Sequence, residues 1–164
     1  MALIDFWIFG FLDFWIFGFL DFWIFGFLKS RCTVSRVITF GTYDVLHIGH
    51  IKLLKRARSL GSHLIVGVSS DELNRDKKGR EPVYPLKSRL EIISSLRFVD
   101  EVFVEDSLDL KAEYITSKNA DILVMGDDWQ GRFDHLSEYC EVVYLPRTPS
   151  ISTTEVIEII KETM

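Results

Sequence analysis

Residues 41–50 read GTYDVLHIGH, a glycine turn that leads to two histidines. The preceding run Val37–Phe40 is apolar and β-branched, and the following segment Ile51–Leu60 has apolar residues at helical spacing. We therefore expect a corner at which a buried strand ends and a helix begins. Such corners bind phosphate, because the first amides of a helix have no intrahelical acceptor and the helix macrodipole is positive there.

His47 and His50 are three residues apart, which places both imidazoles on one face of the first helical turn. Gly49 lies between them and presents no side chain. Two histidines at this spacing are weak evidence by themselves, since ordinary helix starts also carry histidine. Two later stretches add weight, namely MGDDWQGRFD at residues 125–134 and RTPSISTT at residues 147–154.

From residue 35 onward, apolar runs of strand length alternate with segments of helical periodicity. This alternation implies right-handed crossovers and a mostly parallel sheet of about five strands, in one Rossmann-like α/β domain. Polar residues 69–81 interrupt the pattern and are expected to form a mobile loop. The expected strands are 36–40, 63–68, 101–104, 121–125 and 141–145, and the expected helices are 51–60, 85–96, 110–118 and a terminal helix from about residue 153.

Residues 147–154 are expected to form a second phosphate site. Ser152 and Glu155 match the capping box S-x-x-E, so a helix with free amide groups should begin here. Arg147 stands just before it and offers a planar fork of donors that suits phosphate oxygens. The carboxyl ends of parallel strands share one sheet edge, so this stretch should meet the glycine turn there.

Composition excludes several classes of protein. The chain has 164 residues and a net charge of −5, and residues 1–28 contain three Asp and no cation. The rest is almost neutral and has no basic stripe, which argues against nucleic acid as a partner. Cys32 and Cys140 lack CxxC spacing, so we interpret them as free thiols in a reducing compartment, and no protein-held metal is expected.

Residues 5–28 are three identical copies of DFWIFGFL. Residues 1–28 are long enough to span a bilayer as a helix of about 40 Å, and Lys29 and Arg31 behind them would place the following domain in the cytoplasm. A mid-membrane Asp13 would cost about 2.5–3.5 kcal/mol, so a tandem duplication in the coding sequence is an equally good explanation. We treat 1–28 as anchor or extension, 29–34 as linker and 35–164 as the folded domain.

The motifs carry a family resemblance. GTYDVLHIGH resembles the signature of the HxGH nucleotidyltransferases, and MGDDWQGRFD and RTPSISTT resemble their cytidylyltransferase branch, in the right order between Arg36 and the C-terminus. The resemblance implies a cytoplasmic, homodimeric enzyme that transfers CMP from CTP to glycerol 3-phosphate and releases pyrophosphate. It also implies Mg²⁺ carried mainly by the triphosphate.

The same resemblance implies roles for individual residues. The histidines would neutralise charge on the α-phosphate, and Lys78 and Arg80 would close over phosphates. Arg89 and Arg97 match arginines that serve the phosphoalcohol site or the subunit contact. The expected catalytic residues are His47, His50 and Arg147; the expected nucleotide-binding residues are Gly41, Thr42, Gly49, Lys78, Asp128, Thr148, Ile151, Ser152 and Thr153; the expected substrate-binding residues are Arg80, Arg89 and Arg97.

One departure from the family pattern leaves alternatives open. Pro149 and Ser150 stand where the family has a glycine before ISTT, so nucleotide affinity or base selectivity is expected to differ. The alternatives are another phosphoalcohol such as ethanolamine phosphate, ATP in place of CTP, or a module that binds nucleotide without turnover.

Overall fold

The computed structural model of the protein describes residues 35–149 and 151–163. The DFWIFGFL repeats, the 29–34 linker, Cys32 and Ser150 therefore lie outside the described residues, as do the expectations attached to them. Within the described ranges, no helix is long and apolar enough to cross a membrane. Cys140 is a buried free thiol, as expected.

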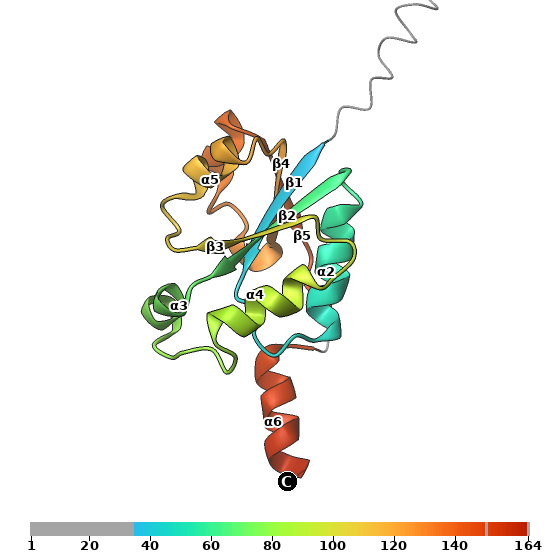
Figure 1. The fold of residues 1–164 in the computed structure, drawn as a ribbon, viewed down its shortest axis with the longest axis vertical. Coiled ribbons are helices and arrows are strands. Elements are labelled where there is room, and N and C mark those ends of the chain that lie inside the picture. The colour runs from blue at the N-terminus through green and yellow to red at the C-terminus, as the bar shows by residue number, and fades with distance from the viewer. Residues whose placement is uncertain (1–34, 150, 164) are drawn as a thin grey trace, which may run out of the picture. The chain divides into compact units, whose positions relative to one another are not determined.

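The fold is built on one parallel sheet (Figure 1). Its strands have the order β3-β2-β1-β4-β5, and every neighbouring pair is parallel, which confirms the expected five-stranded Rossmann-like sheet. The strands are β1 (Arg36–Gly41), β2 (His63–Ser69), β3 (Glu101–Glu105), β4 (Ile122–Gly126) and β5 (Glu141–Leu145).

Helices cover both faces of the sheet, because successive side chains of each strand point to opposite faces. In β1, Val37 packs with α2 and α4, whereas Ile38 packs with α5 and the 3₁₀ segment Asp134–Glu138. Two hydrophobic cores result, one on each face. The helices are α2 (Ile48–Arg58), α3 (Asp71–Lys78), α4 (Leu86–Ser94), α5 (Lys111–Ser117) and α6 (Thr153–Thr163), with a further 3₁₀ turn at Asp127–Trp129.

The expected loop at residues 69–81 is wrong, because most of it forms helix α3. Its N-cap is Ser70, whose Oγ accepts the Leu73 N–H at 3.1 Å, and Gly79 ends it with a φ of 65°. Acidic side chains in the first turn and basic ones in the last complement the helix dipole. The caps are visible in the sequence, but the almost entirely polar composition concealed the helix.

Helix α6 projects from the sheet edge at which the strands end (Figure 1). Its cap follows the sequence prediction, since the Glu155 N–H donates to Ser152 Oγ at 3.2 Å. Thr153 Oγ1 donates to the Asp44 carbonyl at 3.2 Å, which ties the start of α6 to the turn after β1. Two stretches more than 100 residues apart in sequence therefore lie side by side.

Candidate active site

A cavity of about 440 Å³ lies at the carboxyl ends of β1 and β4. These neighbouring strands form the topological switch point of the sheet, because the chain continues from β1 to β2 on one side and β4 lies on the other. The structure brings most of the predicted site residues to this cavity. Its lining includes Gly41, Thr42, His47, Gly49, His50, Lys78, Arg80, Asp128, Arg147, Thr148, Ile151, Ser152 and Thr153.

The two imidazoles form a stacked pair at the start of α2. Their ring centroids are 3.9 Å apart with an interplanar angle of 28°. His47 is the N-cap, and its Nδ1 accepts the Gly49 N–H at 3.1 Å; His50 Nδ1 accepts the His47 N–H at 3.5 Å. Because each Nδ1 is an acceptor, a neutral ring carries its proton on Nε2, where it can be donated to a ligand.

Burial keeps both rings neutral. It lowers the pKa of His50 to about 4, with the neighbouring His47 as a second cause, and it lowers the pKa of His47 as well. At neutral pH the α2 start therefore presents two uncharged Nε2–H donors. Such groups can stabilise oxygens on which charge develops, without a prior proton transfer.

Gly49 is required by this arrangement. A Cβ at position 49 would lie 2.8 Å from His47 Cε1 and 3.0 Å from Ile151 Cγ2. Any larger residue would push the His47 ring out of its cap or displace the segment before α6. The glycine between the histidines therefore allows the start of α2 to approach the segment before α6 closely.

The glycine turn after β1 has a strained backbone. Tyr43 has a φ of 51° and Val45 a φ of 44°, in the left-handed region, at a cost of about 1–3 kcal/mol each. The Asp44 carboxylate accepts N–H groups from Val45 at 3.1 Å, Val83 at 2.8 Å and Tyr84 at 2.9 Å. Asp44 therefore orients the loop.

The hydroxyl of Thr42 joins the turn to α3. Thr42 Oγ1 donates to Asn74 Oδ1 at 2.5 Å and accepts from Lys78 Nζ at 3.3 Å. Lys78 was expected in a mobile loop, but it belongs to the last turn of α3, which holds its side chain against Thr42 of the glycine turn. Phosphate bound here would meet a fixed cation.

Arg147 lines the cavity and is held by acidic side chains. Its Nη2 is 2.7 Å from Asp128 Oδ2, and its N–H donates to Asp127 Oδ1 at 3.2 Å. The Arg147 side chain is 69% exposed, so the ion pair is weak, and a polyphosphate can compete for the guanidinium. Arg56 steadies the same segment by donating to the Pro146 carbonyl at 2.7 Å.

A second group of polar side chains lines the cavity beyond β2 and β3, and the sequence analysis missed it. Lys111 and Glu105 form an ion pair and are only 2% and 1% exposed. Ser69 Oγ donates to Glu105 Oε2 at 2.6 Å, and Lys77 Nζ is 3.9 Å from the same oxygen. Burial lowers the pKa of Lys111 to about 8. No local motif marks these residues, because only the sheet brings them together.

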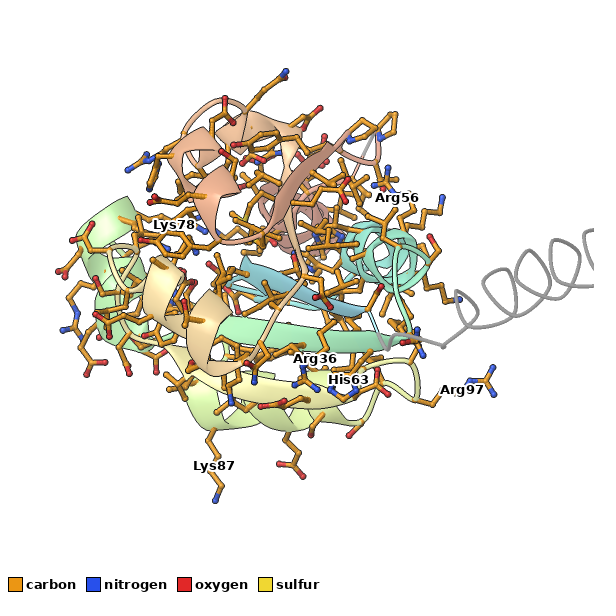
Figure 2. The ribbon with its side chains drawn as sticks, turned by 90° about the horizontal axis from the view of Figure 1, so that it is seen from above. Arg36, Arg56, His63, Lys78, Lys87 and Arg97 are labelled. Atoms are coloured by element: carbon orange, nitrogen blue, oxygen red, sulfur yellow. The ribbon has the colours of Figure 1, made fainter. Side chains whose placement is uncertain are left out.

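Two of the expected substrate-binding residues do not line the cavity. Arg89 is fully buried and does not line the cavity. Arg97 is exposed and also absent from the lining; Figure 2 shows it pointing out from the domain. Arg89 and Arg97 therefore lie outside the lining of this cavity, and their expected roles at the phosphoalcohol site or the subunit contact stay predictions. Arg80, by contrast, does line the cavity.

The cavity's carboxylates are mostly engaged by the protein. Asp44 accepts three backbone N–H groups, and Glu105 is paired with Lys111. Among the described residues, no group of three or more His, Cys, Asp or Glu could hold a metal ion. This donor set fits a cation carried by the oxygens of a polyphosphate better than one held by the protein.

Comparison with known proteins agrees with this geometry. The Cytidylyltransferase-like family matches residues 38–159. Glycerol-3-phosphate cytidylyltransferase of Bacillus subtilis (strain 168) is 49% identical over 125 residues, covering 76% of this chain and 96% of the relative. FAD synthase of Thermococcus onnurineus (strain NA1) is 36% identical over 138 residues, covering 78% of this chain and 92% of the relative.

A solved structure shows the same fold. The lipopolysaccharide core biosynthesis protein from Thermoplasma volcanium GSS1 superposes with a TM-score of 0.60 and 30% identity, covering 70% of this chain and 98% of that one. The family match extends over most of the chain, from within β1 to within α6, and so includes the cavity's histidines and Arg147. The chain belongs to the cytidylyltransferase-like family.

Proposed function

We propose that the protein transfers CMP from CTP to glycerol 3-phosphate, giving CDP-glycerol and pyrophosphate. The observation that carries the proposal is the pair of neutral Nε2–H donors at the start of α2, which share one cavity with Arg147 and the start of α6. The name and 49% identity of the Bacillus subtilis relative support the choice of substrates.

The reaction requires positioning and charge neutralisation. A phosphate oxygen of the acceptor attacks the α-phosphorus of CTP, and the bond to the bridging oxygen of the β-phosphate breaks as pyrophosphate leaves. His47 and His50 donate to the α-phosphate and bridging oxygens as charge builds there. A phosphomonoester is largely dianionic near neutral pH, since its second pKa is about 6, so no general base is required.

The two helix starts divide the triphosphate between them. The glycine turn and α2 receive the α-phosphate, where Thr42 and Lys78 add donors. Arg147 and the first amides of α6, from Ser152 onward, receive the β- and γ-phosphates once the guanidinium exchanges Asp128 for phosphate. Mg²⁺ carried by the triphosphate would supply further charge neutralisation, and Asp128, once released by that exchange, would be able to help hold it.

The acceptor occupies the part of the cavity beyond β2 and β3. Lys77 and Lys111 place two ammonium groups there for a dianionic phosphate, and Glu105 offers carboxylate oxygens to alcohol hydroxyls. Lys111 Nζ already donates to Glu105 and lies 3.6 Å from the centroid of the Phe40 ring, so a phosphate bound here would share the ammonium group with these contacts.

A second candidate is transfer of AMP from ATP, which the FAD synthase relative favours. Pyrophosphate release decides between them, measured with CTP or ATP and with glycerol 3-phosphate, ethanolamine phosphate or FMN as acceptor. The proposal expects turnover with CTP and glycerol 3-phosphate at the highest kcat/KM. ATP with FMN as the best pair would replace it, and nucleotide binding with no release from any pair would indicate a binding module.

Homodimer formation and membrane association are part of the proposal. Exposed apolar side chains at Ile48, Val83 and Tyr84 support a contact between copies. The apolar repeats in residues 1–28 support association with membranes. Analytical ultracentrifugation tests the dimer. Membrane fractionation with and without residues 1–28 tests the anchor, and a full-length chain that stays in the soluble fraction would refute membrane association.

A further inference from the structure

Arg89 is the most connected buried cation of the described residues, and the reaction described above makes no use of it. It is fully buried on α4. Its Nε donates to the Tyr84 carbonyl at 2.9 Å, and its Nη1 donates to the Thr42 carbonyl at 2.7 Å and the Ser69 carbonyl at 2.8 Å. Its Nη2 donates to Asp71 Oδ1 at 2.5 Å. One guanidinium therefore joins three separate segments: the turn at Thr42, the junction of β2 and α3 at Ser69 and Asp71, and the loop at Tyr84.

Each of these segments borders the cavity. Thr42 belongs to the strained turn, and Ser69 ends β2 and binds Glu105 through its hydroxyl. Asp71 begins α3, the helix that supplies Lys77 and Lys78, and Tyr84 follows the loop that carries Arg80. Arg89 thus lies behind the junction between the nucleotide side and the acceptor side of the cavity.

The bond to Thr42 also sets the direction of a backbone donor. The carbonyl of Thr42 and the N–H of Tyr43 belong to one trans peptide, so they point in opposite directions. Fixing the carbonyl on Arg89 turns the Tyr43 N–H away from that buried side, and this N–H has no acceptor among the described residues. The left-handed φ of Tyr43 needs such a restraint, because an unrestrained tyrosine rarely adopts it.

We propose that Arg89 is a positioning residue, which holds the Thr42–Tyr43 peptide in the orientation that receives the triphosphate. It also fixes the start of α3 relative to that peptide. The proposal rests on the proposed function for its ligand, CTP, but its structural part concerns the turn alone. A lysine at position 89 keeps the charge but cannot reach four acceptors in one plane.

The test compares Arg89→Lys and Arg89→Met with a matched control, Arg36→Met, in the full-length protein. Arg36 also joins separate segments, donating to the Lys118 carbonyl at 2.7 Å and to Glu101 at 3.2 Å, but it begins β1 at the opposite end of the strand from the turn. Amide hydrogen exchange of a peptide spanning residues 41–46, the CTP dissociation constant and kcat/KM are measured below the Tm of every variant.

We expect both Arg89 variants to exchange faster in residues 41–46 and to lose about 100-fold in kcat/KM for CTP. The control should lower Tm while leaving exchange in that peptide and kcat/KM within about threefold of wild type. The proposal would be overturned if the Arg89 variants exchanged residues 41–46 at the wild-type rate. It would also be overturned if the Arg36→Met control lost as much kcat/KM as the Arg89 variants. If the wild type makes no CDP-glycerol, the proposed function fails, whereas the exchange comparison still decides the role of Arg89.

A milder variant covers the case in which the Arg89 variants do not fold. Asp71→Asn weakens one of the four bonds and leaves the guanidinium in place. We expect faster exchange in residues 41–46 and a CTP dissociation constant raised by about threefold, as for one weakened charged hydrogen bond. If neither quantity changes, Arg89 is not a positioning residue.

Discussion

His47 has two roles in the structure, and they can be separated by substitution. Its Nδ1 caps α2 by accepting the Gly49 N–H at 3.1 Å, and its Nε2–H is free for phosphate. Asparagine can accept the capping N–H but has no group at the Nε2 position. The free energy of unfolding of His47→Asn should therefore lie within about 0.5 kcal/mol of the wild-type value. That of His47→Ala should be lower by about 1 kcal/mol, because alanine cannot cap the helix.

Both variants should lose about 10²–10³-fold in kcat, the usual loss when one preorganised donor to a developing charge is removed. Urea unfolding measures the stability and pyrophosphate release measures kcat. Ser70→Ala is the control, because it removes the N-cap bond of α3, 3.1 Å long, without touching the imidazoles. The free energy of unfolding of Ser70→Ala should fall by about 1 kcal/mol, and its kcat should stay close to the wild-type value. A His47→Asn variant with kcat close to wild type would refute the donor role and leave His47 as a cap only.

Three further predictions concern neighbouring groups. Gly49→Ala should lower kcat/KM by about 100-fold while the helix is retained, because its Cβ would lie 2.8 Å from His47 Cε1; kinetics and far-UV circular dichroism check this, and unchanged kinetics would contradict it. The contribution of His50 to the free energy of unfolding should fall by at most about 1.4 kcal/mol per pH unit from pH 6.5 down to about 4, since unfolded His50 binds a proton in that window and folded His50 does not; urea titrations at several pH values should show a smaller slope in His50→Gln, and an identical slope would exclude His50 as a cause. Lys111→Met should raise KM for glycerol 3-phosphate at least about tenfold with little change in KM for CTP, and should destabilise the fold by about 3 kcal/mol, because buried Glu105 loses its closer cation and keeps only Lys77 at 3.9 Å; combining it with Glu105→Gln should restore stability but not KM, and a normal KM for glycerol 3-phosphate would move the acceptor site elsewhere.

Local patterns predicted the elements that bury apolar side chains. Strands β1, β2 and β4 are short apolar runs, and Ser152 is recognisable as a cap from the glutamate three residues later. Helix α3 was not predicted because it buries only Leu73 and Asn74, so its sequence shows almost no helical periodicity of apolar residues. Its caps and its charge pattern were the evidence available from sequence.

The sequence by itself determined the parallel sheet and the helix starts that line the cavity, because strand periodicity and capping residues act over a few neighbouring positions. Only the tertiary structure decided that Lys111 and Glu105 line the cavity, while Arg89 is buried behind it and Arg97 faces solvent. The physical reason is that burial and ion pairing depend on which distant segments the sheet places together. A lysine or arginine therefore has the same local pattern whether it contacts substrate, braces a turn or faces water.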